Sequence, residues 1–315
     1  MTNQVTLPEI QIQAQQSRRP ISEGAEKWIG NPIKCLDHGF VYLVDYMGND
    51  QAITQAARVS YGTGTKKLSE DEGLIRYLKR NKHTTPLEMV EFKFHCKMPI
   101  FVARQWIRHR TANVNEYSAR YSILGKEFYI PKPEHLAVQS VTNRQGRGDV
   151  VAAEDAEKII QGFKDDGEKQ YKRYLELLNE EGGAAIDPER PCLARELARM
   201  GLGVNFMTEW YWKIDLHNLM HFLQLRLDAH AQYEIRVFAE AMAQIVKDAV
   251  PIAFKAFEDY HKNSMTLSAP EIAFVRACTW PQGELDARNL LSGHITNKRE
   301  ADECIAKLKS MGLIG

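Results

Sequence analysis

Apolar positions along the chain follow two periods, and each period predicts its own kind of element. Between residues 90 and 98 apolar and polar side chains alternate, which is typical of a strand with one buried face. A strand-like apolar run covers residues 39–45, and an aromatic run covers residues 206–212. Elsewhere apolar residues recur three and four positions apart, which predicts helices over residues 53–58, 69–78, 99–107, 154–179, 191–200, 216–228, 231–250 and 297–311.

The order of these elements predicts the fold class. Strands are mixed with helices, but the regular strand–helix–strand alternation of a doubly wound sheet is missing. We therefore expect an α+β fold with a mixed sheet flanked by helices. Residues 1–33 are polar and are predicted to form an N-terminal arm, and Gly62 to Thr65 predicts a break in the chain. Residues 135–155 are predicted to contain a surface insertion, and residues 263–315 a C-terminal extension.

Composition narrows the function classes. Lysine plus arginine total 41 and aspartate plus glutamate total 41, so any anion site must be local and there is no general case for nucleic-acid or membrane binding. A hydrophobic content of 44% supports a substantial core. The five cysteines are odd in number and include no CxxC pair, which favours reduced thiols. With no signal-peptide or membrane-spanning pattern, we expect a cytoplasmic protein.

The richest chemistry lies in residues 104–121. This stretch holds four arginines, one histidine, one glutamate and one serine, but no lysine. The rigid guanidinium fork suits phosphates and carboxylates better than the point charge of lysine does. The part before Arg108 has helical spacing, whereas the residues after Arg110 are poor helix formers. Residues 108–118 are therefore predicted to form a helix end followed by an ordered loop, and structural ion pairs are the alternative role for the arginines.

Nucleotide-binding loops of the common kinds are missing from the sequence. There is no G-x-G-x-x-G after a strand and no G-x-x-x-x-G-K-[ST], so neither a Rossmann unit nor a P-loop is supported. If a dinucleotide cofactor binds, its phosphates must be held by arginines, histidines and backbone groups.

Arg108-His109-Arg110, followed after seven residues by Ser118, resembles the RHR-x7-S signature of the flavin-dependent thymidylate synthases. The resemblance extends over residues 34–262, which we expect to form the catalytic domain. Further matches in this range are Glu116, Arg120, Tyr121, Leu36 to Gly39, Ala57 to Ser60, His83 to Pro86 and Leu225 to Glu234.

The resemblance implies an activity and its reactants. It implies the non-Rossmann fold of that family and conversion of dUMP to dTMP. The cofactor would be FAD, the reductant NADPH and the carbon donor 5,10-methylenetetrahydrofolate. Reduced flavin would supply hydride, with no covalent protein nucleophile. The family is homotetrameric, with active sites shared between subunits.

The resemblance also implies which residues form the site. Arg226 is implied as the catalytic residue. The residues implied to bind dUMP are Gln105, Arg108, Glu116, Ser118, Ala119, Arg120, Arg199 and Arg226. Those implied to bind FAD are His83, Thr85, Glu88, Arg108, His109, Arg110, Glu116, His217, His221 and His230.

Several of these residues have other readings. Ser118 could be a nucleophile with His109 as its base, although the surrounding arginines favour a phosphate ligand. The segment His83 to Glu88 also fits a capping box in which Thr85 begins a helix. His217 and His221 lie four residues apart, a spacing that zinc sites use, but no third ligand is evident, so we expect no metal site.

Two positions near these candidates are expected to play structural roles. Asp215 is predicted to cap a helix or to face away, because an acid would repel a flavin phosphate. Pro191-Cys192 lacks the following histidine of a classical thymidylate synthase, so Cys192 is predicted to be buried packing. A non-catalytic RNA-binding protein, using the arginines and Trp106, Tyr117 and Tyr121, is the alternative from another class. A metal-dependent hydrolase is the third.

Overall fold

The computed structural model describes residues 18–59, 71–141, 146–266, 283–293 and 295–314. The chain divides into two compact units, Met1–Lys262 and Asn263–Gly315. Residues 1–17 of the predicted arm lie outside the described residues, as do the break at 62–65, Ser60, Ser69, Glu70 and Cys278.

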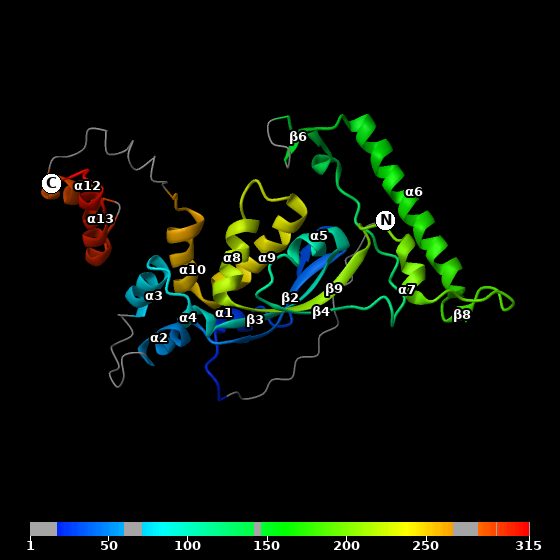
Figure 1. Cartoon of the computed structure of the whole chain (residues 1–315), viewed down its shortest axis with the longest axis horizontal. Coiled ribbons are helices and arrows are strands. Elements are labelled where there is room, and N and C mark those ends of the chain that lie inside the picture. The colour runs from blue at the N-terminus through cyan, green and yellow to red at the C-terminus, as the bar shows by residue number, and fades with distance from the viewer. Residues whose placement is uncertain (1–17, 60–70, 142–145, 267–282, 294, 315) are drawn as a thin grey trace. The chain divides into compact units, whose positions relative to one another are not determined.

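The first unit is built on a five-stranded antiparallel sheet (Figure 1). Its strand order is β1 (Ile33–Cys35), β2 (Gly39–Met47), β3 (Glu91–Pro99), β9 (Met207–Asp215) and β4 (Asn113–Glu116). The α+β class is confirmed, but the sheet is antiparallel rather than mixed. The connections explain this, because Met47 at the end of β2 pairs with Glu91 at the start of β3. Likewise Pro99 pairs with Met207, so each connection returns the chain to the end where the previous strand stopped.

Helices and short strands surround this sheet. The helices of the first unit are α1 (Glu23–Glu26), α2 (Asp50–Val59), α3 (Asp71–Arg80), α4 (Thr85–Glu88), α5 (Ile100–Trp106), α6 (Ala153–Leu178), α7 (Arg195–Ala198), α8 (Leu216–Arg226), α9 (Tyr233–Ala249) and α10 (Pro251–Phe257). Short 3-10 helices occupy Pro133–His135 (η2) and Arg199–Gly201 (η3), and a π-helical turn occupies Glu258–Lys262 (η4). Two small hairpins pair β5 (Ala137–Gln139) with β6 (Arg147–Val150), and β7 (Glu180–Glu181) with β8 (Ala184–Ala185). None of the helices in the described ranges is long and apolar enough to cross a membrane.

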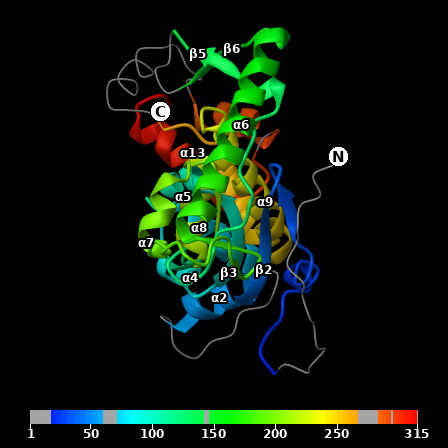
Figure 2. The same ribbon diagram turned by 90° about the vertical axis from the view of Figure 1, so that its right-hand side faces the viewer.

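The apolar face of the sheet packs under α5, α8 and α9 (Figures 1 and 2). The alternating residues of β3 predicted from the sequence, such as Phe92 and Phe94, are fully buried there. Trp106 at the end of α5 is also fully buried, with its ring centroid 5.2 Å from that of Trp212 and 5.0 Å from that of Phe222. This packing fixes the position at which α5 ends, and therefore where residues 108–110 leave the core.

Tertiary pairing changes the prediction for residues 108–118. An ordered loop was expected, but Asn113–Glu116 form the edge strand β4, with Val114 opposite Trp212 and Glu116 opposite Trp210. Local composition excluded a helix correctly, but it could not reveal hydrogen bonding to a strand about 100 residues away.

Two other predicted segments also differ in detail from the structure. The polar insertion contains the β5–β6 hairpin. The helix predicted at 191–200 is reduced to the short elements α7 and η3.

Part of the predicted N-terminal arm packs on the first unit. Ser22 caps α1, and its hydroxyl donates to the carbonyl oxygen of Ala249 at 2.7 Å. The indole Nε1 of Trp28 donates to Asp248 Oδ2 at 3.0 Å. Residues 22–28 are therefore attached to the end of α9.

The second unit holds α12 (Glu284–Ser292) and α13 (Lys298–Ser310). The helix predicted at 297–311 is confirmed, with Asn297 accepting hydrogen bonds from the backbone N–H groups of Arg299 and Glu300. The helix α12 was not predicted.

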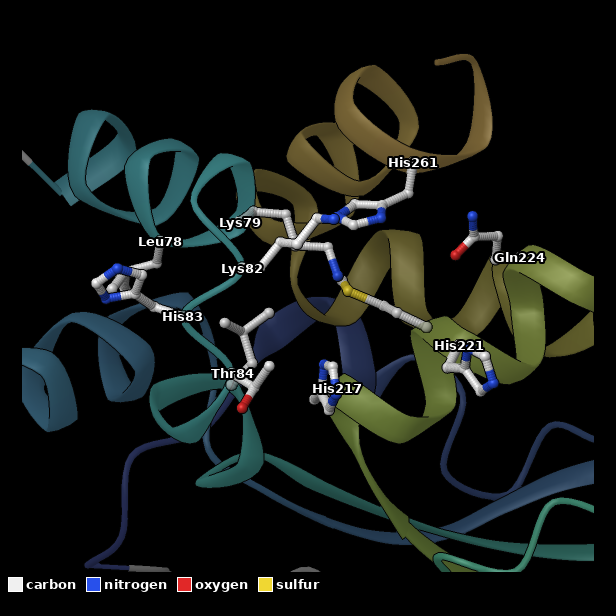
Figure 3. A pocket seen from close by; sticks show the side chains of 11 residues that line it. Leu78, Lys79, Lys82, His83, Thr84, His217, His221, Gln224 and His261 are labelled. Atoms are coloured by element: carbon white, nitrogen blue, oxygen red, sulfur yellow. The ribbon is translucent and has the colours of Figure 1, made fainter. Parts of the chain in front are cut away.

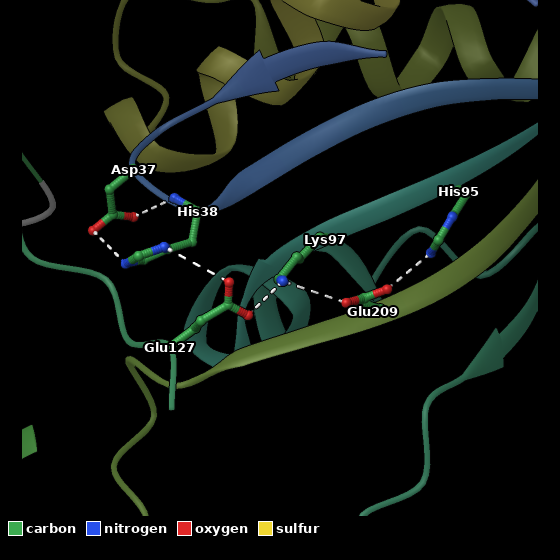
Figure 4. Close-up of polar contacts among 6 residues, drawn as sticks. All are labelled: Asp37, His38, His95, Lys97, Glu127 and Glu209. Atoms are coloured by element: carbon green, nitrogen blue, oxygen red, sulfur yellow. Dashed lines mark hydrogen bonds and ion pairs between the residues drawn. The ribbon is translucent and has the colours of Figure 1, made fainter. Parts of the chain in front are cut away.

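The polar face of the sheet carries a row in which acidic side chains alternate with lysine and histidine (Figure 4). Lys97 of β3 is nearly buried, and its Nζ lies 2.5 Å from Glu127 Oε2 and 3.5 Å from Glu209 Oε1. The row continues from Glu127 to His38 at 3.8 Å, and from Glu209 to His95 at 3.0 Å. It therefore attaches the segment around Glu127, which follows the arginine-rich stretch, to two central strands.

This row predicts an acid-sensitive contribution to stability. The hydrogen bond from His95 and the charge of Lys97 lower the pKa of Glu209, although partial burial opposes them. The stabilisation is therefore complete above the ordinary glutamate pKa of 4.5 and is lost as the pH falls from there through the lower folded-state pKa. We expect Glu209→Gln to flatten the pH dependence of unfolding below about pH 5, measured by urea denaturation. Glu154→Gln on exposed α6 is the control, and an unchanged profile for Glu209→Gln would contradict the assignment.

Candidate functional site

The end of α5 presents the Arg108-His109-Arg110 triplet beside the last turn of α8. The backbone N–H of His109 donates to the carbonyl of Trp106 at 2.9 Å, so the triplet follows directly from the buried helix end. The His109 ring meets Phe222 edge-on, with centroids 4.9 Å apart. Its Nε2 accepts a hydrogen bond of 3.1 Å from Nε of Arg226. Residues 117 positions apart in the sequence thus form one contact.

Burial and this contact act together on the protonation of His109. Burial lowers the pKa of the imidazole to about 4, and the charge of Arg226 and the neighbouring His221 act in the same direction. His109 is therefore neutral at neutral pH. Because Nε2 accepts from Arg226, the ring proton is on Nδ1, which remains a donor.

The arginines around His109 lack acidic partners. Arg108 and Arg110 are exposed and form no ion pair with any residue of the described ranges. Arg226 is half-buried, and within the same ranges its guanidinium bonds only to His109. The alternative of structural ion pairs therefore holds only for Arg120, whose Nε lies 3.3 Å from Glu196 Oε2. Uncompensated arginines at one place favour an anionic ligand.

The loop after β4 is held by α6 and α7. Ala119 is buried in a cluster with Tyr174 and Ala198, and Arg195 Nη1 donates to the carbonyl of Tyr121 at 2.8 Å. Arg195 was not singled out from the sequence, because its only local signal is a basic residue in a short helix. Arg199 is exposed at the start of η3, next to α7.

The polar candidates on and before this loop have contacts of their own. Glu116 Oε1 accepts from the hydroxyl of Thr208 at 2.7 Å. Ser118 Oγ accepts from the backbone N–H of Arg120 at 3.3 Å. Ser118 and His109 are therefore engaged with different partners, which disfavours a nucleophile–base pair. Gln105 Oε1 is buried without a hydrogen-bond donor among the described residues.

A cavity of about 250 Å³ lies between the end of α3, the start of α8 and η4 (Figure 3). The expected residues His83, His217 and His221 line it. Three basic residues that the sequence analysis missed line it as well: Lys79, Lys82 and His261. His221 also lies beside His109, with ring centroids 6.1 Å apart, so α8 connects the cavity with the arginine cluster.

Thr85 and Glu88 do not line this cavity. Thr85 lines a neighbouring, larger groove of about 610 Å³ between α2, α3 and α4. The capping-box reading is wrong, because Thr84 is the N-cap of α4 and makes no side-chain capping bond. The helix is a single turn, so its local pattern was too short to define its start.

Three further candidates have clear places. Asp215 caps α8 as predicted, its carboxylate accepting from the backbone N–H of Asn218 at 3.0 Å and from Asn218 Nδ2 at 2.7 Å. His230 is exposed and bonds Asp228 at 2.8 Å, away from the cavity. Cys192 is exposed, so its predicted burial is wrong: α7 begins only at Arg195, and the residues before it lie on the surface.

Metal ligation is not supported by the clusters seen. Within the described ranges no group of three or more His, Cys, Asp or Glu side chains has metal-binding geometry. His217 and His221 share their cavity with two lysines instead.

Comparison with known proteins gives one consistent result. A family model described as "Thymidylate synthase complementing protein" (Thy1) matches residues 42–252. The flavin-dependent thymidylate synthase of Ruegeria pomeroyi is 58% identical over 260 residues, which cover 82% of this chain and 84% of the relative. That of Rickettsia bellii is 55% identical over 262 residues, covering 82% and 89%.

A solved structure shows the same fold. The UMP/dUMP methylase PolB of Streptomyces cacaoi, bound with 5-Br dUMP, superposes with a TM-score of 0.62 at 31% identity. The match covers 73% of this chain and 99% of that one. The family model spans most of the chain and the relatives exceed half identity over four-fifths of it. The chain therefore belongs to the flavin-dependent thymidylate synthases, a family of enzymes.

Proposed function

We propose that this enzyme converts dUMP to dTMP by reductive methylation, with FAD as cofactor, NADPH as reductant and 5,10-methylenetetrahydrofolate as carbon donor. The observation that carries the proposal is the group of arginines around the neutral His109 that have no acidic partners within the described ranges. The names of the close relatives and the nucleotide bound to the similar methylase agree with it.

The dUMP site in this proposal uses each residue type for what it can bind. Arginines serve the phosphate and the pyrimidine oxygens, and Gln105 Oε1, which has no donor among the described residues, accepts from a ring N–H of the base. Glu116 binds a sugar hydroxyl, and Ser118 with the backbone around Ala119 binds phosphate. The arginines assigned here are Arg108, Arg120, Arg199 and Arg226.

The flavin site in this proposal lies between the arginine cluster and the cavity beside α8. The fit rests on charge, because the described residues that line the cavity include lysines and histidines but no carboxylate. When bound, the flavin supplies the hydride that completes the methyl group. In this proposal His109 donates its Nδ1–H to a carbonyl oxygen or a ring nitrogen of the flavin. The residues proposed to hold the cofactor are His83, Thr85, Glu88, Arg108, His109, Arg110, Glu116, His217, His221 and His230.

The proposal needs no protein nucleophile. Cys192 is on the surface, and Cys35 and Cys96 are buried in the core, where burial raises the pKa of both thiols and suppresses the thiolate. Catalysis would then depend on orientation and electrostatics.

We further propose a homotetramer in which neighbouring copies complete each pocket. Its support is exposure: Arg108, Arg110, Tyr121 and Met200 leave one side of the candidate site open to solvent in a single protomer. Light scattering should then give about four times the chain mass of 36.0 kDa.

An absorbance experiment tests the proposed function. Purified protein should show a flavin spectrum that bleaches with anaerobic NADPH and shifts when dUMP is added. The formation of dTMP with 5,10-methylenetetrahydrofolate would complete the test. A protein that takes up no added FAD, or forms no dTMP, would refute the proposal.

A further inference from the structure

Lys79 is a buried cation that the site residues discussed so far leave without a role. It lies on α3, in the position that helical spacing from Ile75 assigns to the apolar face, and only 7% of its surface is exposed. Lysine is rarely buried without an acidic partner, because removing the ammonium from water costs free energy. Consistently, burial lowers the pKa of Lys79 to about 8.

The neighbours of Lys79 on the same helix are paired. Arg76 Nη1 lies 2.8 Å from Asp259 Oδ2, and Asp71 pairs with Arg58. Lys79 makes no ion pair with the residues of the described ranges, and its Nζ lies 5.7 Å from the ring centroid of Phe257. The fold therefore pairs Arg76 and Asp71 of α3, whereas this ammonium has no counter-charge in the part of the chain that the structure describes.

The ammonium faces the cavity beside α8. In Figure 3 the side chain of Lys79, from α3, and that of Lys82, from the turn after α3, extend toward the space bordered by His261 and by α8. Among the described residues, every ionisable side chain that lines the cavity is a lysine or a histidine. The nearby carboxyl groups of Asp215 and Glu88 act to raise the pKa of His217, but neither residue lines the cavity. Asp215 is also engaged in capping α8.

Two histidines of the cavity lining, His217 and His261, lie near the ammonium of Lys79. Burial and then the charge of Lys79 lower the pKa of both His217 and His261. His217 can therefore offer an imidazole N–H to an anion, whereas His261 gains a second N–H only when an entering anion favours its protonated form. His261 is kept in place by a hydrogen bond to the backbone of Lys79.

We propose that Lys79, with His217 and His261, binds a phosphate group of a nucleotide cofactor in this cavity, an assignment that rests on the flavin chemistry proposed above. A compact ammonium with several surrounding donors suits a phosphate, whereas bidentate carboxylate recognition favours arginine, and no arginine lines the cavity. A volume of about 250 Å³ admits a pyrophosphate but not a whole dinucleotide. The phosphate can come from FAD or from NADPH.

The first test is calorimetric titration of the full-length chain with inorganic pyrophosphate. Lys79→Met keeps the apolar stem and removes the charge, so we expect pyrophosphate affinity to fall about 10- to 100-fold. Lys158→Met, on exposed α6, is the matched control and should bind as the unaltered chain does. Equal binding by Lys79→Met and the unaltered chain would overturn the proposal. So would a preference for a glutamyl-glutamate dipeptide, since that would assign the cavity to the carboxylates of a folate.

Stability separates a binding role from a structural one. Lys79→Met removes an unpaired buried charge, so the ligand-free variant should unfold at a higher temperature than the unaltered chain. Pyrophosphate should stabilise the variant less than it stabilises the unaltered chain. A lower unfolding temperature of the ligand-free variant would show that the lysine is structural and would contradict the proposal.

Cofactor measurements then identify the source of the phosphate. Weaker FAD binding with an unchanged preference for NADPH over NADH would assign the cavity to the flavin pyrophosphate. Loss of that preference with normal FAD binding would assign it to the additional phosphate of NADPH. If Lys79→Met changes neither FAD binding nor the preference for NADPH while the unaltered enzyme forms dTMP, only the Lys79 assignment fails. If the unaltered chain takes up no FAD, the proposed function fails, and the pyrophosphate titration still tests the cavity.

Discussion

Arg226→Ala is expected to lower the turnover of dUMP about 100- to 1,000-fold without changing the fold. Arg226 lies at the end of α8, and its guanidinium donates one N–H to His109. Its other N–H groups have no partner within the described ranges. The substitution therefore removes both the contact with His109 and the N–H groups that are proposed to bind dUMP. Steady-state dTMP formation, with thermal unfolding to verify the fold, measures the effect.

Two variants sharpen the Arg226 prediction. Arg226→Lys keeps a charge but loses the planar fork, so it should recover only part of the activity. Arg173→Ala removes an arginine from exposed α6 and should leave turnover unchanged. The pKa of His109 should rise from about 4 in Arg226→Ala, because the nearby positive charge is gone. Near-normal turnover in Arg226→Ala would refute its assigned role.

Arg147→Ala is expected to be the most destabilising of the substitutions considered for this chain. Glu234, in the first turn of α9, is only 2% exposed and accepts from Arg147 Nη2 at 2.7 and 2.5 Å. It also accepts from the Tyr129 hydroxyl at 3.1 Å and from Gln232 at 2.9 Å. Burial alone would raise the pKa of Glu234, but the hydrogen bonds and charge of Arg147 outweigh it and lower the pKa. Removing Arg147 leaves a buried carboxylate without its counter-charge.

The size of the loss follows from how buried the pair is. Breaking a fully buried ion pair costs about 3–5 kcal/mol, and Arg147 keeps some contact with solvent, so we expect about 2–4 kcal/mol. Urea denaturation measures this free energy of unfolding. Lys126→Ala breaks the exposed pair with Glu168 and should cost less than about 1 kcal/mol. Equal losses in the two variants would contradict the stabilising role assigned to the buried Arg147–Glu234 pair.

The sequence alone was sufficient for elements whose pattern is long and regular. The alternation at 90–98 predicted β3, and helical spacing predicted α6, α8 and α9 to within a few residues. The cap of α8 by Asp215 was also predictable, because capping involves only residues three positions apart. The RHR-x7-S pattern indicated the family that the comparisons confirm.

The tertiary structure decided what depends on distant partners. The pairing of β4 with β9, and the antiparallel sheet itself, depend on hydrogen bonds between strands far apart in the sequence. The cavity joins Lys79 with His217 and His261, and the sequence alone did not single out Lys79 or His261 as site residues. Local propensity is determined by neighbouring residues, whereas burial, ion pairing and pKa shifts arise only when the packed core brings remote side chains together.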